Sequence, residues 1–283
     1  MSWARIQVIF FIFLVSHLPQ SLCQVNTFPD VFATEDASKM AQTRNFGNTS
    51  VALTKTEASQ QSQLFALSWQ QTIPVGGPIF YVNLGRVDGD DMRDVVAACN
   101  FEKGGKGYVY VINGSNNLLW RYLVDGKSIS EVAICDLDND VNIEIIVGLI
   151  SEGKVSICAL DNTGELLWEY ETECLSLLKM LVGDLTGDER DDVVFLSDEI
   201  HAIRSDGMLL WERPAETIKD IVLGDVDGDQ IQDVITASTV GIVDAIKSDG
   251  SFLWTWKVGY QIQTIGAGDL DGNWEDEVVL ITD

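Results

Sequence analysis

Basic residues are scarce in this chain. Its 283 residues include 18 Lys and Arg against 44 Asp and Glu, which gives a formal net charge of −26. Such a surplus of negative charge repels nucleic acids and anionic lipid surfaces, which argues against both as partners, and we expect no nucleic-acid ligand. Two interpretations remain: a well-solvated acidic surface, or carboxylates that are clustered to hold cations. The distribution of the acids along the chain decides between them.

Histidine and cysteine are also rare, which argues against several kinds of catalytic site. The chain has two histidines, and only His201 lies beyond the N-terminal segment. There is no phosphate-binding loop, no HExxH motif and no second histidine to support a Ser-His-Asp triad. The five cysteines include no CxxC pair, which argues against thiol redox chemistry and against a zinc site. These absences favour a non-enzymatic protein.

Apolar runs of the roughly 20 residues that cross a bilayer are absent as well. The run Ile6–Val15 is shorter, follows Arg5 and precedes Ser21-Leu22-Cys23. A basic residue, a short apolar run and small residues before a cleavage point are the parts of a secretory signal peptide. We predict a signal peptide over residues 1–23, and a secreted or cell-surface protein with no further transmembrane segment. An uncleaved anchor is the alternative.

Export would leave four cysteines in a compartment that permits disulfides. Four cysteines allow three connectivities, and the sequence selects none of them. The alternative is that all four are reduced, buried side chains that pack as small hydrophobes. The four residues are Cys99, Cys135, Cys158 and Cys174.

A repeated unit of about 45 residues fills the chain from residue 63 to residue 283. Residues 24–62, before it, are polar and are predicted to be a poorly ordered linker. Each unit carries an acidic loop after an apolar strand and, further on, an apolar pair followed by tryptophan. The five loops begin at Arg86, Asp136, Asp184, Asp225 and Asp269. The tryptophans are Trp120, Trp168, Trp211 and Trp254, with Trp69 as a degenerate copy.

Short β-rich runs separate these signatures. In the second unit they cover residues 131–135, 144–149, 155–160 and 166–171. Four antiparallel strands in such a unit are typical of a β-propeller blade, and no segment keeps the helical apolar period of other repeats. We predict an all-β β-propeller of four-stranded antiparallel blades with at least five repeats. It is either a five-bladed ring, closed by the segment near Trp69, or part of a larger ring.

The acidic loops have the spacing Asp-x-Asp-x-Asp-x-x-x-Asp, which favours calcium. Calcium takes six to eight oxygen ligands at about 2.3–2.6 Å. In a tightly curled loop the side chains at positions 1, 3, 5 and 9 can come together around one ion, and position 7 can add its backbone carbonyl. Position 4 is Gly in four loops and Asn139 in the other, and both residues tolerate positive φ. Without a cation such carboxylates would repel one another. Magnesium is the lesser alternative, because it demands tighter geometry.

Four loops provide the predicted Ca²⁺ ligands. The first loop has Arg86 at position 1, and its positive charge would repel a cation, so this loop is not among the predicted sites. The predicted ligands are Asp136, Asp138, Asp140, Asn142 and Glu144; Asp184, Thr186, Asp188, Arg190 and Asp192; Asp225, Asp227, Asp229, Ile231 and Asp233; and Asp269, Asp271, Asn273, Glu275 and Glu277.

The loops resemble the FG-GAP and VCBS repeats of integrin-alpha-like propellers, and the resemblance runs from about Leu64 to Asp283. The Gly-x-Leu-Leu-Trp segments look like the tryptophan strands of PQQ-type blades. The resemblance implies calcium-binding loops on a propeller. One departure is that family loops often have Gly at position 6, where this chain has Asp91, Val141, Glu189, Gln230 or Trp274.

The function that follows is a non-enzymatic, calcium-binding module that binds protein or carbohydrate at the cell surface or outside the cell. His201 occupies a position that sister repeats fill with Tyr110, Cys158 or Asp244, so we interpret it as structural. One tryptophan per repeat is explained better by packing between blades than by a quinone cofactor. Alternatives are a propeller-based polysaccharide lyase or hydrolase, and a purely structural module of a longer surface protein.

Overall fold

The computed structural model describes residues 49–56, 65–73, 79–100, 106–140 and 142–282, and their regular secondary structure is β-strand. Four sheets have four antiparallel strands and two have two strands. The four-stranded sheets are β3 (Ile79–Gly85), β4 (Asp94–Asn100), β5 (Lys106–Ile112), β6 (Leu118–Asp125); β7 (Ser128–Cys135), β8 (Glu144–Ser151), β9 (Lys154–Leu160), β10 (Leu166–Thr172); β11 (Lys179–Gly183), β12 (Asp192–Leu196), β13 (Glu199–Ile203), β14 (Leu209–Pro214); and β15 (Ile218–Gly224), β16 (Asp233–Ser238), β17 (Ile242–Ile246), β18 (Phe252–Lys257).

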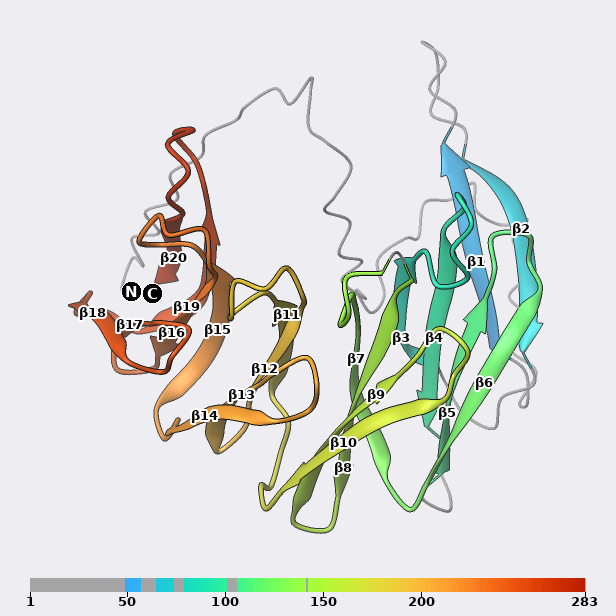
Figure 1. Ribbon diagram of the computed structural model, residues 1–283, viewed down its shortest axis with the longest axis horizontal. Helices are drawn as coiled ribbons and strands as arrows, with labels where there is room; N and C mark the ends of the chain where they lie inside the picture. The colour runs from blue at the N-terminus through green and yellow to red at the C-terminus, as the bar shows by residue number, and fades with distance from the viewer. Residues whose placement is uncertain (1–48, 57–64, 74–78, 101–105, 141, 283) are drawn as a thin grey trace, which may run out of the picture.

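The sheets are the blades of a propeller and follow one another along an open arc (Figure 1). Within each blade the strands pair in chain order, so every neighbour is joined by a hairpin. The first strand of each blade contacts the first strand of the next, from β3 through β7, β11 and β15 to β19 (Ile262–Gly268). The predicted strands of the second unit are confirmed to within three residues at their ends.

The two-stranded sheets have the registers of half-blades. In the hairpin of β1 (Thr49–Thr56) and β2 (Phe65–Ile73), Trp69 pairs with Leu53, and the strand register shifts directly beside this pair. In the second blade, Trp168 of the fourth strand pairs with Ala159 of the third strand, beside the same kind of register shift. It therefore matches the third and fourth strands of a blade. The pair β19–β20 (Glu277–Thr282) matches the first and second strands, and the two half-blades form separate sheets.

Strand β1 corrects the predicted linker. Residues 49–56 belong to the polar segment 24–62, but they pair with β2 along their whole length. Their sequence alternates apolar Val51 and Leu53 with polar residues, and this period of two suits a strand even in a polar stretch. The signal segment 1–23 and the rest of the linker lie outside the described residues.

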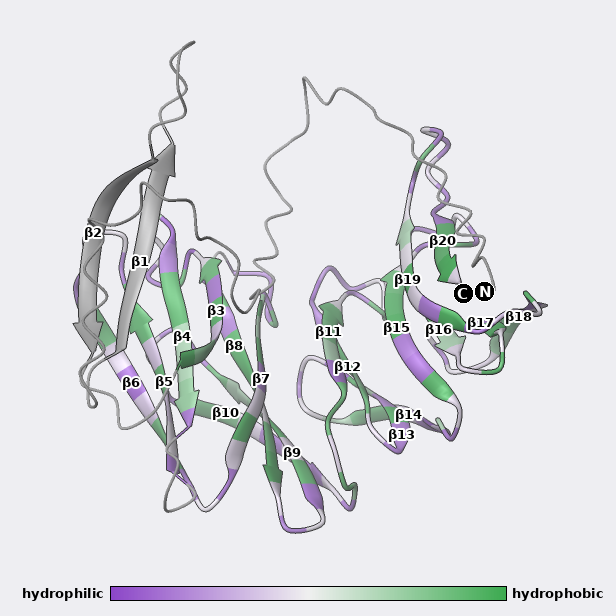
Figure 2. Cartoon of the chain, turned by 180° about the vertical axis from the view of Figure 1, so that it is seen from behind, coloured by the Kyte–Doolittle hydropathy of each residue, from purple (hydrophilic) through white to green (hydrophobic). Residues whose placement is uncertain are grey.

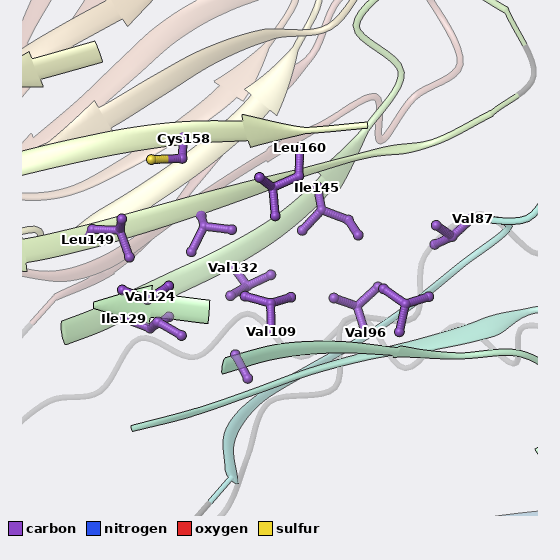
Figure 3. Packing of buried hydrophobic residues seen from close by; sticks show 13 residues of the cluster. Val87, Val96, Val109, Val124, Ile129, Val132, Ile145, Leu149, Cys158 and Leu160 are labelled. Atoms are coloured by element: carbon purple, nitrogen blue, oxygen red, sulfur yellow. The ribbon is translucent and has the colours of Figure 1, made fainter. Parts of the chain in front are cut away.

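The core lies between the blades. The second strand of each complete blade is buried along nearly its whole length, whereas the fourth strand alternates exposed and half-buried residues. Figure 2 shows the same contrast between the hydrophobic β4 and the mixed β6. Between the first two blades Val96 and Val109 face Val132 and Ile145 (Figure 3).

Three tryptophan strands, β6, β10 and β14, are each hydrogen-bonded to the next blade. Trp168 Nε1 donates a hydrogen bond to the Ser205 carbonyl at 2.8 Å, and a Cβ on Gly207 would lie 2.8 Å from the Trp168 ring. Only glycine fits beneath the indole, and its φ of 86° also suits it to the turn. Trp120 and Trp211 repeat both contacts with Asn162 and Gly164, and with Ser248 and Gly250. The predicted role of the tryptophans in packing between blades is confirmed for Trp120, Trp168 and Trp211.

The cysteines that the structure describes are reduced. Cys99, Cys135, Cys158 and Cys174 are all free and buried, as the packing alternative predicts. Burial raises the pKa of the Cys158 thiol to about 12 and that of Cys135 well above its usual range, so both stay protonated at neutral pH.

Candidate cation-binding loops

Every acidic loop joins the first and second strands of its blade, so the loops share one end of the propeller. Loops one to five begin at residues 86, 136, 184, 225 and 269, and position 9 is the first residue of the second strand. Loops two to five are joined in succession by backbone hydrogen bonds. Asp191 N donates to Asp136 O at 2.8 Å, Gln232 N to Asp184 O at 3.1 Å, and Asp276 N to Asp225 O at 2.6 Å. These four loops therefore form a continuous acidic row.

Position 9 anchors each loop to the sheet. In all five loops its carboxylate accepts a hydrogen bond from the backbone N–H of position 2. In the second loop, for example, Leu137 N lies 2.8 Å from Glu144 Oε2. The acid is buried in the first four loops and half-buried in the fifth. The anchoring acids are Asp94, Glu144, Asp192, Asp233 and Glu277.

The carboxylate at position 1 holds the curled backbone of the loop in four of the five loops. The Asp225 carboxylate accepts hydrogen bonds from the N–H groups of Gly228, Asp229 and Gln230, at 2.7, 3.1 and 2.8 Å. Asp136, Asp184 and Asp269 accept the N–H groups of their own positions 4 and 5 in the same way. At position 5 the side chain accepts the N–H of position 7, which fixes the backbone of Asn142, Arg190, Ile231 and Glu275.

The predicted positive φ at position 4 is confirmed in all five loops, where it ranges from 59° at Asn139 to 84° at Gly272.

Position 6, where the related families often have glycine, also has a positive φ in three loops of this chain. Glu189, Gln230 and Trp274 adopt φ of 62°, 68° and 73° without being glycine. In each case the backbone N–H of that residue donates to the position-1 carboxylate, which holds the strained turn in place.

Four loops each bring three carboxylates within 4.8 Å of one another. Among the described residues the third loop forms no such group, because Thr186 replaces an acid there. Loop one does converge its acids although it was left out of the predicted set, and Arg86 forms no ion pair with them in the described structure. The groups are Asp88, Asp90 and Asp94; Asp136, Asp138 and Glu144; Asp225, Asp227 and Asp229; and Asp269, Asp271 and Glu277.

The crowded carboxylates resist ionisation. Burial, reinforced by neighbouring acids, raises the pKa of Glu144 to about 7 and that of Asp192 and Asp233 to about 6. The pKa of Asp138 is raised for the same reasons. Asp269 is the exception, because hydrogen bonds from its loop backbone, that of Gly272 first, lower its pKa. A divalent cation beside these carboxylates would favour their charged form and so lower their pKa.

Loop four already contains a cation from its own chain. Lys247, the residue after β17, forms a close ion pair with Asp227 and lies 3.7 Å from Asp229 Oδ2. The other carboxylate oxygen of Asp227, Oδ1, is buried without a hydrogen-bond partner. The spacing of the loop acids gives no sign of this lysine. The available signal was a basic residue directly after the third strand, where the second blade has Asp161.

The predicted ligands thus fall into three groups. Loops two and five bring their acids together with no basic side chain in an ion pair with them in the described structure. Loop four brings them together around Lys247. Loop three curls in the same way but lacks one acid.

These sheets and loops define a β-propeller whose blades carry acidic loops between their first two strands. BBS1N, crystallised in complex with ARL6DN and soaked with lead, has the same fold. It is 13% identical with a TM-score of 0.53, and the match covers 77% of this chain and 66% of BBS1N. Two weaker matches are the V. cholerae biofilm matrix protein Bap1 and the Pan2 WD40 domain of Neurospora crassa. Bap1 is 18% identical with a TM-score of 0.46, and the match covers 65% of this chain and 30% of Bap1. The Pan2 domain is 13% identical with a TM-score of 0.44, and the match covers 72% of this chain and 60% of that domain.

No family model and no curated protein matches the chain. At 13% identity the likeness to BBS1N shows the fold alone. Across the described residues, no helix is long and apolar enough to cross a membrane.

Proposed function

We propose that this protein is an exported, non-enzymatic β-propeller of the FG-GAP/VCBS type, whose loops bind calcium and which binds a protein or carbohydrate ligand at the cell surface or outside the cell. The observation that carries the calcium proposal is the convergence of three acids within 4.8 Å in loops two, four and five. The buried Asp227 Oδ1, which accepts no hydrogen bond, and the raised pKa of Glu144 both suit a site that binds a cation. The oxygen-only ligand sets suit calcium or magnesium rather than a softer metal.

The binding role is supported by the shape of the fold and by one neighbour. BBS1N was crystallised with a partner protein, ARL6DN. In this chain the loop end presents a row of acids that calcium would partly neutralise. A ligand at that end would therefore bind in a calcium-dependent manner, since the cations fix the loop backbone that it contacts.

Isothermal titration of calcium into the chelator-treated full chain tests the metal. We expect at least three sites of extracellular type, with dissociation constants of about 10⁻⁴ to 10⁻³ M, and weaker binding of magnesium. Absence of any calcium binding to the folded protein would contradict the proposal. A screen of the calcium-loaded protein against polysaccharides and surface proteins tests the ligand class. Cleavage of a polysaccharide in that screen would favour an enzyme instead.

A further inference from the structure

A second group of metal-ligating side chains lies at the opposite end of the third blade from its acidic loop. Cys174 belongs to the connection between β10 and β11, and Glu199 and His201 lie on β13. Residues two apart on a strand point to the same face, so both β13 side chains turn toward the cysteine. Cys174 is 2% exposed and His201 is fully buried. The Glu199 side chain is 44% exposed and connects the group to solvent.

The three donor atoms are already spaced for one metal ion. Cys174 Sγ lies 3.8 Å from His201 Nε2, and Glu199 Oε2 lies 3.6 Å from the same nitrogen. All three atoms fall within 4.8 Å of one another. A tetrahedral zinc ion, with Zn–S near 2.3 Å and Zn–N or Zn–O near 2.0–2.1 Å, separates such donors by about 3.3–3.6 Å. Small rotations of the side chains would close the difference.

The outer contacts of the histidine are those of a metal ligand. Its other nitrogen, Nδ1, lies 3.3 Å from the Tyr170 hydroxyl and 3.9 Å from Glu212 Oε2. Metal-bound histidines commonly donate this second N–H to a carboxylate or another acceptor, which fixes the ring. Phe195 stacks on the imidazole at 4.6 Å between ring centroids and 10° between planes. The ring is therefore held with Nε2 toward the cysteine.

The cysteine is supported in the same way. Ser197 Oγ, which donates its proton to the Glu199 carbonyl at 2.8 Å, lies 3.2 Å from Cys174 Sγ and helps to fix the position of the sulfur. The same three residue types could form a hydrolytic Cys-His pair, but a buried sulfur offers no access to a substrate. The sister blades place Tyr110, Cys158 and Asp244 where the third blade has His201, so the group is not a repeat feature of the fold.

We propose that Cys174, Glu199 and His201 bind a thiophilic divalent metal of the zinc class, with water in the fourth position. The mixed sulfur, nitrogen and oxygen donors select such a metal over calcium. The site is separate from the acidic loops in both position and chemistry. It also revises the expectation, drawn from the lack of a CxxC pair, that the chain has no zinc site.

Cobalt(II) reports on the site without interference from the loops. The full chain is saturated with calcium and titrated with Co²⁺. We expect one equivalent to give a sulfur-to-cobalt charge-transfer band with tetrahedral visible absorption, and Zn²⁺ to displace it. Cys174→Ser should abolish the charge-transfer band and His201→Gln should weaken binding more than about tenfold, while the matched control Cys158→Ser keeps the full signal. Glu212→Gln should weaken binding by about 10- to 100-fold, as loss of an outer-shell partner does.

X-ray absorption at the zinc edge of the wild-type protein needs no variant. It should show one sulfur at about 2.3 Å with nitrogen and oxygen neighbours at about 2.0–2.1 Å. A zinc ion surrounded by oxygen alone, or a charge-transfer band that persists in Cys174→Ser, would overturn the proposal.

Discussion

Loop two and loop four carry equally complete sets of acids, yet loop four has a lysine among its carboxylates and loop two does not. Lys247 extends from the end of β17 to Asp227 and Asp229. The corresponding residue of the second blade is Asp161, whose carboxylate is occupied by N–H groups of its own turn. Among the described residues no basic side chain forms an ion pair with the acids of loop two, and Arg190 only partly offsets the rise that burial and neighbouring acids cause in the pKa of Asp138. The comparison indicates that loop two depends more on a metal than loop four, which Lys247 already neutralises in part.

Removal of calcium should have the largest effect, because it acts on all loops at once. At roughly tenfold excess over its dissociation constant, calcium stabilises the fold by about 1.4 kcal/mol per site, and three sites give about 4 kcal/mol. A usual domain has only about 5–15 kcal/mol of stability in total. We expect chelation to lower the melting temperature clearly, with poor rescue by magnesium. Identical thermal unfolding curves with and without chelator would show that calcium does not stabilise the fold and would contradict the prediction.

The pH dependence of the calcium-free protein comes next. The pKa is about 7 for Glu144 and about 6 for Asp233, both raised mainly by burial, and Lys247 works against the shift at Asp233. The folded state therefore keeps protons that the unfolded chain has lost. As a result, the free energy of unfolding falls as pH rises from about 4 to about 7.

Urea unfolding from pH 4.5 to 8, with and without calcium, measures this. Calcium should flatten the decline, because the bound carboxylates are then charged and paired. Glu144→Gln should reduce the upper part of the decline and Asp233→Asn the lower part, with the remainder due to Glu131 and Asp192, whose pKa values burial raises to about 7 and about 6. A decline unchanged in both variants contradicts the assignment to these two loops.

Single acid removals compare the two loops directly. Asp138→Ala should abolish one calcium site and lose about 1.4 kcal/mol of calcium-dependent stability at tenfold excess. Asp227→Ala should lose less of it, because Lys247 already occupies that carboxylate. Calcium titration and thermal unfolding of both variants provide the measurement, with Asp198→Ala, outside the loops, as the control. Equal losses in the two loops would show that the lysine does not compete with calcium.

Removal of Lys247 should have the smallest effect on the calcium-loaded protein. Lys247→Ala frees Asp227 and Asp229, so loop four should bind calcium more tightly and the variant should be less stable than wild type once calcium is removed. Lys257→Ala at the end of β18 is the matched control, because it removes the same charge away from the loop. Calorimetry of calcium binding checks the change, and an affinity for calcium unaltered by Lys247→Ala counts against the competition.

Much of this arrangement was determined by the sequence. The strands of the second unit, the positive φ at Asn139 and its sister glycines, and the packing of Trp168 all followed from patterns within one repeat. Such features depend on local backbone conformation and on the period of two, and the repeat reports them several times over. The positive φ at position 6 did not follow from such local patterns, because the φ of Glu189 depends on where the Asp184 carboxylate points.

Only the tertiary structure decided which side chains meet across the strands. Lys247, directly after β17, reaches Asp227 and Asp229 of loop four, which lie 20 and 18 residues earlier in the chain, and Cys174 meets His201 from a different connection. The distances depend on how the hairpins fold back within a blade, and no spacing motif records them. The strand over 49–56 was missed for the same reason: its composition is polar, and its pairing with β2 is what makes it a strand. Periodic and local features are written along the chain, whereas contacts between strands exist only once the sheet has formed.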